Sequence, residues 1–295
     1  MKKKLSNILI ILIFLAGLSL LLYPFVANEW NTYRQSKLIT TYDQVVAEKE
    51  ETDGIDYQAE WDRAYQYNMD LLPSILPDSF AIAAAAEKPD KEYMACLNLT
   101  GDGTMGYVEI PKIDIKIPIY HTVSTEVLEK AAGHLEGSSL PSGGGSTHAV
   151  ISAHRGLPSA ALFTDLDKLV EGDHFLLYIL DEILCYEVDK ISVVEPSDTD
   201  ALQVEEDQDL VTLLTCTPYG VNSHRLLVRG HRVEYVPEVV EEETVPFAQQ
   251  SLHTNYLLWV VVGIAVTGGF ILILFLHERK LKERLKAERK EPSKE

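Results

Sequence analysis

The stretch LVTLLTCTPYG at 210–220 combines a buried strand with a forced end to that strand. The six apolar or β-branched residues at 210–215 are typical of a strand buried on both faces. Pro218 must break the ladder, because proline has no N–H to donate. The strand therefore delivers Cys216 to a cleft built from loops. A thiol in that place is a candidate nucleophile, although a lone cysteine in an apolar strand is usually a small buried hydrophobe.

Two further strands are expected near this thiol, one that begins at Arg225 and one that stops at His154. Residues 225–233 (RLLVRGHRV) alternate with period two, and a strand–loop–strand connection sets Cys216 beside Arg225. Residues 149–153 (AVISA) form an apolar strand that stops at His154. An ordinary cysteine has a pKa of about 8.5 and is mostly protonated at neutral pH, so catalysis needs a neighbouring base or cation. His154 and Arg225 supply both types of group.

Short β-rich runs separated by Gly and Pro continue through the chain after Gly101. Their number and spacing predict a closed barrel or a sandwich, with strands at 106–111, 113–120, 148–153, 174–180, 183–194, 210–215 and 225–233. Helical signal in this part is limited to 126–132 and 159–166. Before it, from residue 28 to residue 67, apolar residues spaced three and four apart predict two amphipathic helices.

Two uncharged apolar stretches frame the chain. Three lysines precede the first, at 5–26, which is either a signal peptide or a signal anchor. Bulky residues at 23–26, where a cleavable signal carries small ones, favour an uncleaved anchor. The second stretch, 256–276, has no charge and matches the roughly 20 residues that a helix needs to cross a bilayer. It predicts a second membrane span.

Charge near these stretches predicts the orientation of the chain. The tail 277–295 holds eight Lys/Arg against five Asp/Glu, and the first 27 residues hold three Lys and no acid. Basic flanks stay in the cytoplasm, so both termini are expected there. The total charge of −19 then leaves −25 for residues 28–276. Such a polyanion is repelled by phosphate backbones, which argues against nucleic-acid binding, and its acidity is better explained by solubility than by a cation site.

Four strings together resemble the sortases, and specifically the class C sortases that assemble pili. They are TLLTCTPYG at 212–220, NSHRLLVRGHR at 222–232, AVISAHRGLP at 149–158 and GYVEIPKIDIKIPIYH at 106–121. The resemblance implies an eight-stranded barrel in a membrane-anchored cysteine transpeptidase of a Gram-positive surface. It also implies Cys216 as the nucleophile, His154 as the general acid and base, and Arg225 as the donor to the substrate carbonyl or oxyanion.

The resemblance further implies the reaction and its partners. Sortases cut an LPxTG-like sorting signal between Thr and Gly, with no metal or organic cofactor required. In class C relatives a pilin lysine resolves the thioacyl intermediate, so the implied partners are pilins or other surface proteins with such signals, and an amine acceptor. Two alternatives remain: a housekeeping-type sortase that attaches proteins to a peptidoglycan amine, and a non-catalytic membrane-tethered adhesion or scaffold module.

Class C relatives also carry a lid segment before the barrel. Its Asp-Pro-Phe or Asp-Pro-Trp motif brings an acid to the catalytic Arg and a ring over the Cys. The matching place here holds Asp78, Ser79 and Phe80, with Ser instead of Pro, which makes the turn less rigid. The alternative is that Asp78 or Ser79 caps a short helix at 80–87.

These inferences divide the chain into six segments. They are a cytoplasmic Lys-rich end with the anchor (1–27), an extracytoplasmic helical region with the lid (28–100), the catalytic barrel (101–236), an acidic linker (237–255), the second span (256–276) and a basic cytoplasmic tail (277–295).

Several other side chains have structural explanations that are favoured over functional ones. They are His148, His224 and His231 near the motifs, and the acids Glu205, Glu206, Asp207 and Asp209, which lack the spacing and central Gly of a calcium loop. The sequence leaves open whether Cys96 and Cys185 pair.

Overall fold

The structure is a computed structural model of the 295-residue chain. It describes residues 2–49, 56–71, 80, 89–242 and parts of 261–283. The chain divides into two units, one made of Met1–Leu22 with Pro246–Glu295 and the other of Tyr23–Val245. The second unit contains the sheet and the candidate site residues.

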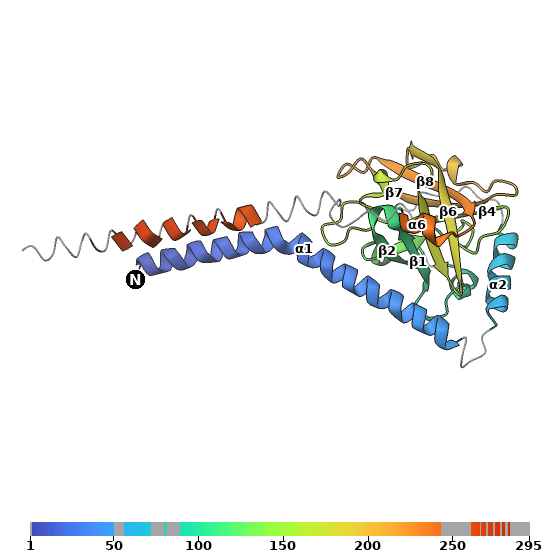
Figure 1. Cartoon of the computed structure of the whole chain (residues 1–295), viewed down its shortest axis with the longest axis horizontal. Helices are drawn as coiled ribbons and strands as arrows, with labels where there is room; N and C mark the ends of the chain where they lie inside the picture. The colour runs from blue at the N-terminus through green and yellow to red at the C-terminus, as the bar shows by residue number, and fades with distance from the viewer. Residues whose placement is uncertain are drawn as a thin grey trace, which may run out of the picture. The chain divides into compact units, whose positions relative to one another are not determined.

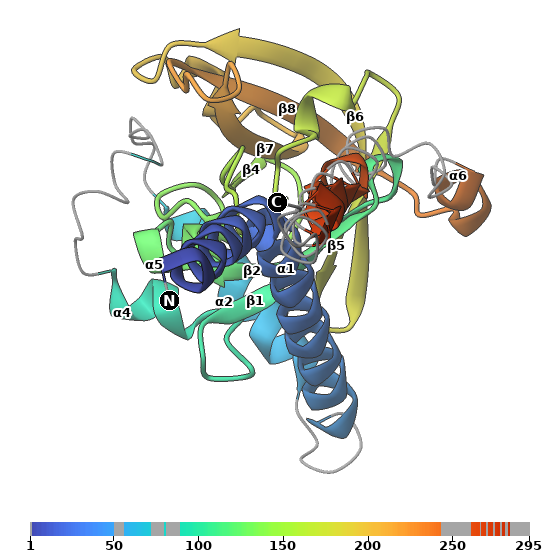
Figure 2. The same cartoon turned by 90° about the vertical axis from the view of Figure 1, so that its left-hand side faces the viewer.

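Eight strands close into a barrel in the order β1-β2-β3-β4-β7-β8-β6-β5. Figure 1 shows the barrel, with β1, β2, β4, β6, β7 and β8 labelled. The strands are β1 Thr104–Ile110, β2 Ile115–His121, β3 Ala132–His134, β4 Thr147–Ser152, β5 His174–Ile179, β6 Glu182–Val194, β7 Asp209–Thr217 and β8 His224–Val233. Neighbours are antiparallel except β2 with β3 and β4 with β7. β4 lies beside β7, and β6 beside β8 (Figure 2). The eight-stranded barrel implied by the sequence resemblance is confirmed.

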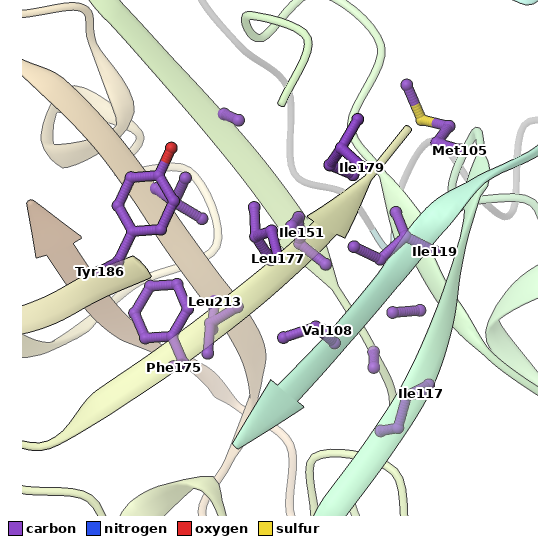
Figure 3. Close-up of a cluster of buried hydrophobic side chains, with 14 of the residues drawn as sticks. Met105, Val108, Ile117, Ile119, Ile151, Phe175, Leu177, Ile179, Tyr186 and Leu213 are labelled. Carbon is purple, nitrogen blue, oxygen red and sulfur yellow. The ribbon is translucent and has the colours of Figure 1, made fainter. Parts of the chain in front are cut away.

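Alternate residues of these strands fill the interior of the barrel. Figure 3 shows Val108, Ile151, Leu177 and Leu213 converging there from four strands, and all are buried. Burial of such side chains contributes about 1.5–3 kcal/mol each, which is the main driving force for closing the sheet. The outward faces of β4, β7 and β8 carry side chains of a second apolar cluster, outside the barrel. The candidate site lies beside this cluster.

The strand β3 and the connections around it differ from the sequence prediction. A helix was expected at 126–132, but α5 covers only Thr125–Leu128 and the chain then enters β3. Residues 159–166 were expected to form a helix, but they contain turns at 162–165, and only the end of the range enters a short 3-10 helix, Leu166–Lys168. The physical reason is tertiary: the Phe163 N–H donates to the His154 carbonyl at 3.1 Å, and the Ala161 N–H donates to Asn28 Oδ1 at 2.8 Å. Helical hydrogen bonds are replaced by these contacts.

Within the described residues before the barrel, the helices with defined bounds are α1 Lys2–Glu48, α2 Tyr57–Asp70 and α4 Lys91–Ala95. In its second half α1 packs on the barrel, where the Tyr42 hydroxyl donates to the Met105 carbonyl at 3.0 Å. In α2 the Trp61 indole donates to Asp181 at 3.0 Å. The two amphipathic helices expected before the barrel are therefore present, the first as a direct continuation of the apolar N-terminal helix.

The helix α1 contains a candidate membrane-spanning segment. Among the described residues one helix, Leu12–Glu48, contains a segment long and apolar enough to cross a bilayer. The expected second span, 256–276, lies partly outside the described residues; its described part belongs to a shorter apolar helix, Val261–His277. The second span therefore stays a prediction. The expected linker after the barrel begins with the short helix α6 Pro237–Glu242, whose Val240 packs beside Cys185.

Gly106 is a position where the barrel tolerates no side chain. Its φ is +157°, and a Cβ there would lie 2.1 Å from the Tyr178 carbonyl oxygen of β5. We expect Gly106→Ala to lower the free energy of unfolding by about 1–3 kcal/mol, measured by chemical denaturation, because β1 would be pushed from β5. Gly145→Ala is the control, since its Cβ would meet its nearest atoms at an ordinary 3.7 Å. Equal stability of the two variants would contradict this account.

Candidate active site

The pairing of β7 with β8 brings two candidate residues together. In this antiparallel register Cys216 stands directly opposite Arg225, as the strand–loop–strand connection predicted. Both are largely buried, with exposed fractions of 7% for Cys216 and 9% for Arg225. The guanidinium Nη1 donates to the Asn222 carbonyl at 3.3 Å and to the His224 carbonyl at 3.2 Å. The loop between the two strands thus orients Arg225 beside the thiol.

His154 reaches the same place from β4, which is parallel to β7. Two hydrogen bonds hold the chain just before it: the Ala153 N–H donates to the Leu214 carbonyl at 3.1 Å, and Thr215 Oγ1 donates to the Ala153 carbonyl at 2.7 Å. His154 therefore follows a strand end that is fixed immediately beside the end of the Cys216 strand.

Burial sets the protonation preference of His154. The half-buried imidazole has its pKa lowered by loss of solvent, and the negative charge of Glu129 opposes that shift. Burial is the larger effect, so the neutral ring is favoured at neutral pH. A neutral imidazole can accept a proton from a thiol or an amine and then return it.

The three side chains share the outer face of the barrel. Strand alternation turns Leu213 into the interior and Leu214 outward, which puts Cys216 on the outer face as well. Beside them lies a set of buried apolar residues that we call the outer cluster: Val123, Leu128, Leu135, Val150, Leu202, Leu214 and Leu227. The candidate site therefore lies at the polar edge of a buried apolar cluster.

Phe80 covers part of this surface. Its ring centroid is 5.2 Å from that of His154, with the planes tilted by 34°, and 5.0 Å from Cζ of Arg225. The ring also packs against the outer cluster. A guanidinium at this distance from an aromatic face is attracted by the ring quadrupole. Asp78 and Ser79 lie outside the described residues, so the pairing of Asp78 with Arg225 stays a prediction.

Arg155 is a residue that the sequence analysis did not single out. Its side chain is 8% exposed and forms an ion pair with Asp167. Nη1 donates to Thr217 Oγ1 at 3.1 Å and Nε to the Thr164 carbonyl at 3.1 Å. Arg155 thus joins the loop after His154 to the strand end that carries Cys216. The only signal for it in the sequence is its position next to His154.

The three histidines near the sequence motifs, His148, His224 and His231, have local partners. His148 is buried, with Nδ1 2.8 Å from the Gln203 carbonyl and Nε2 2.8 Å from Thr212 Oγ1. His224 Nδ1 is 2.8 Å from Ser223 Oγ, and His231 Nδ1 is 3.9 Å from Asp189. These contacts account for the three rings without a catalytic role.

Structural roles also account for two of the acids noted in the sequence, Glu205 and Asp209, and both other cysteines are buried. Glu205 pairs with Arg229 at 2.6 Å, and Asp209 accepts from the Tyr186 hydroxyl at 3.0 Å. Cys96 and Cys185, both within the described part of the chain, are buried and are not joined by a disulfide.

Comparison with known proteins gives a consistent result. A protein-family model of the sortase domain matches residues 108–233, a range that contains His154, Cys216 and Arg225. Sortase D of Bacillus subtilis is 30% identical over 131 residues, which are 43% of this chain and 63% of that protein, less than two thirds of its length.

Solved structures extend the similarity. Sortase C of Streptococcus pneumoniae, whose structure has been used to examine catalysis and pilin substrate specificity, is 45% identical with a TM-score of 0.62, over 68% of this chain and 98% of that one. A lid mutant of sortase A from Corynebacterium diphtheriae is 43% identical with a TM-score of 0.56, over 61% and 95% of the two chains.

The Arg155 contacts generate a stability test. Arg155→Met keeps an aliphatic side chain but removes the donor to Thr217 Oγ1 and to the Thr164 carbonyl. We expect a loss of about 1–2 kcal/mol in the free energy of unfolding, because two partly buried acceptors lose their donor. Asp167→Asn should cost less than about 1 kcal/mol, since the Asp167 side chain is 47% exposed. A larger loss for Asp167→Asn in chemical denaturation would refute the bridging role of Arg155.

Proposed function

This chain belongs to the sortase family of cysteine transpeptidases, and we propose that it polymerises pilus subunits by cleaving an LPxTG-like sorting signal and transferring the acyl group to a pilin lysine. The observation that carries the proposal is the β7–β8 register, in which Cys216 faces Arg225, together with the position of His154 just after the end of β4 beside β7. The 45% identity to sortase C over nearly the whole of that chain favours the pilus type.

In the proposed first step the thiol attacks the signal. The Cys216 proton moves to His154, and the sulfur adds to the Thr carbonyl carbon. The resulting oxyanion accepts hydrogen bonds from Arg225, which the loop carbonyls hold in place. The C–N bond to Gly then breaks as His154 returns the proton to the leaving amine. The product is a thioester between Thr and Cys216.

In the second step a lysine amine resolves this thioester. His154, neutral again after returning its proton to the leaving amine, removes a proton from the neutral lysine amine as the nitrogen attacks the thioester carbonyl. Arg225 again stabilises the oxyanion. The C–S bond breaks, and the proton passes from His154 to the sulfur, which regenerates the Cys216 thiol. An isopeptide bond joins the two subunits.

We propose that the apolar part of the signal binds at the place on the outer cluster where Phe80 packs. The leucines and valines of the cluster lie on the face that carries Cys216 and are 0–3% exposed with the ring in place, so a signal would reach them by displacing Phe80, and its Leu and Pro would be buried there instead. Phe80 packs on this cluster and over His154 and Arg225. Signal and Phe80 would then compete for one surface, which gives Phe80 the role of a lid. Substrate binds only in the fraction of molecules from which the ring has moved.

Membrane attachment is part of the same proposal. The apolar first half of α1 would anchor the enzyme in the membrane of a Gram-positive bacterium. Residues 256–276 would form a second span, with both termini in the cytoplasm because of their basic flanks. The catalytic barrel would then face the cell exterior, where its substrates are displayed.

The nucleophile assignment is tested by mass spectrometry of the protein incubated with an LPxTG-type peptide. Cys216→Ala should abolish the thioacyl adduct while the fold survives. Cys185→Ala is the control, because Cys185 is 1% exposed among apolar neighbours and should leave turnover largely intact. An adduct that persists in the Cys216 variant would exclude Cys216 as the nucleophile. A lysine peptide and a peptidoglycan amine are added in parallel reactions. The amine that resolves the thioester distinguishes a pilus-type sortase from a housekeeping-type sortase.

The lid role of Phe80 is tested by the reactivity of Cys216. Removing a ring that interacts with a cation by about 0.5–2 kcal/mol should accelerate alkylation of Cys216 by a bulky reagent roughly 2- to 30-fold in Phe80→Ala. Tyr33→Ala, which removes an aromatic ring that is 62% exposed on α1, should leave the rate unchanged. Melting temperature is measured on both variants. A lower melting point without faster alkylation in Phe80→Ala would leave a purely structural role for the ring.

A further inference from the structure

The three chemical side chains of the site are not fixed in the same way. Cys216 and Arg225 lie within paired strands, so the β7–β8 register fixes them. β4 ends at Ser152, which is its last residue paired with β7. His154 follows this strand end on a loop. Its position relative to the thiol therefore depends on contacts of the loop rather than on a strand ladder.

Hydrogen bonds within the loop give it a defined shape. The Phe163 N–H donates to the His154 carbonyl at 3.1 Å. Two donors converge on Thr164: the Gly156 N–H bonds to its Oγ1 at 3.0 Å, and Arg155 Nε bonds to its carbonyl at 3.1 Å. These bonds close the loop into one unit, but they do not connect that unit to β7.

Two other hydrogen bonds tie the loop to β7, one before His154 and one after it. Thr215 Oγ1 donates to the Ala153 carbonyl at 2.7 Å. Arg155 Nη1 donates to Thr217 Oγ1 at 3.1 Å. The first threonine precedes the thiol in the sequence and the second follows it. The same pair of links therefore brackets the histidine on one chain and the thiol on the other.

These links lie on the opposite face of β7 from the thiol. Side chains alternate along a strand, so Thr215 and Thr217 share one face and Cys216 occupies the other. The outer cluster, including Leu214, is on the face of the thiol. A substitution at Thr217 can therefore remove a link without changing the face to which the signal would bind.

The Tyr219 ring covers the Arg155 link. It packs on Gly156, where a Cβ would lie 3.0 Å from a ring carbon, and its centroid is 6.0 Å from Cζ of Arg155. The Arg155 side chain is 8% exposed and forms an ion pair with Asp167. A hydrogen bond screened from water in this way is electrostatically stronger than an exposed one. The link from Arg155 to Thr217 is thus a protected contact.

We propose that Arg155 is a positioning residue for the transpeptidase reaction. Through Thr217 it holds the His154 imidazole at the distance from the Cys216 sulfur that proton transfer needs. Because Arg155 acts through Thr217 and not on the substrate, its loss lowers the maximal rate and leaves the half-saturating concentration of the signal peptide nearly unchanged. This inference rests on the proposed function and adds to it a residue that sets the geometry of the Cys–His pair.

The test removes the link from the strand side, in the full chain in detergent micelles. Thr217→Val keeps the β-branched shape and loses the acceptor of the Arg155 hydrogen bond. A displacement of about 1 Å can cost roughly 100-fold, so we expect single-turnover thioacyl formation with an LPxTG-type peptide to slow roughly 10- to 100-fold. Arg155→Lys should give the same loss, because it keeps the charge but not the planar fork that reaches Thr217 and Thr164 together.

Thr147→Val is the matched control. Thr147 is buried, and its Oγ1 donates to the Gly144 carbonyl at 2.6 Å. It is the first residue of β4, at the end of the strand away from His154. The same chemical change at this place should lower the melting temperature without slowing thioacyl formation. Melting temperature is measured on every variant.

The pH profile of Cys216 alkylation is a readout that a merely structural role would not move. A small reagent such as iodoacetamide needs the thiolate, which His154 helps to form below the ordinary cysteine pKa of about 8.5. In Thr217→Val the rate should fall near neutral pH and approach the wild-type rate at about pH 10. The charges that act on the pair, Arg225 of β8 and Glu129 after α5, are the same in both proteins.

Three results would overturn the inference. One is wild-type rates with an unchanged pH profile in both Thr217→Val and Arg155→Lys. Another is slower thioacyl formation with a parallel pH profile, since the supply of thiolate would then be intact. The third is equal slowing in Thr147→Val, because the loss would follow general destabilisation. If the wild-type chain forms no thioacyl adduct, the proposed function fails, whereas the alkylation profile still reports whether Arg155 positions His154.

Discussion

The register of β7 against β8 is the constraint on which the site depends. It places Cys216 opposite Arg225, and a shift of one residue would turn one of the two into the barrel interior. Closure of the barrel prevents such a shift, because each strand is paired on both sides and its inward face is packed in the core. The parallel pairing of β4 with β7 extends the same constraint to His154. Catalytic geometry is thus a consequence of how a hydrophobic barrel closes, and the three chemical side chains contribute little to that closure.

Local patterns in the sequence predicted most of this arrangement. They failed where contacts with residues distant in the sequence determine the local structure. Periodicity identified seven of the eight strands, and the end of the apolar run at Pro218 located the thiol. The strand β3 was missed because three residues carry too little pattern. Residues 159–166 looked helical but contain turns, held by contacts such as the one to Asn28. The role of Arg155 was invisible for the same reason, since its partner Thr217 is distant in sequence.

The helix α1 links the membrane-anchor sequence to the catalytic loops in one continuous element. From Asn28 onward its polar side chains bond to the loop after His154 and to the end of α5. Further along, Tyr42 bonds to the Met105 carbonyl and accepts from the Leu180 N–H at 2.8 Å. An amphipathic helix in isolation would gain little from propensity alone, so these contacts and the burial of its apolar face are what stabilise it. The segment before the barrel is therefore part of the catalytic unit.

Phe80 bears on the acyl-donor half of the proposed reaction. Its ring packs on the outer cluster and lies 5.2 Å from the His154 ring and 5.0 Å from Cζ of Arg225. Under the proposed function this is the place where the apolar part of the signal would bind. The apparent affinity for the donor would then be reduced by the fraction of molecules in which the ring has moved. Because acylation precedes transfer, such a ring would control entry into the reaction and leave the choice of amine to a later step.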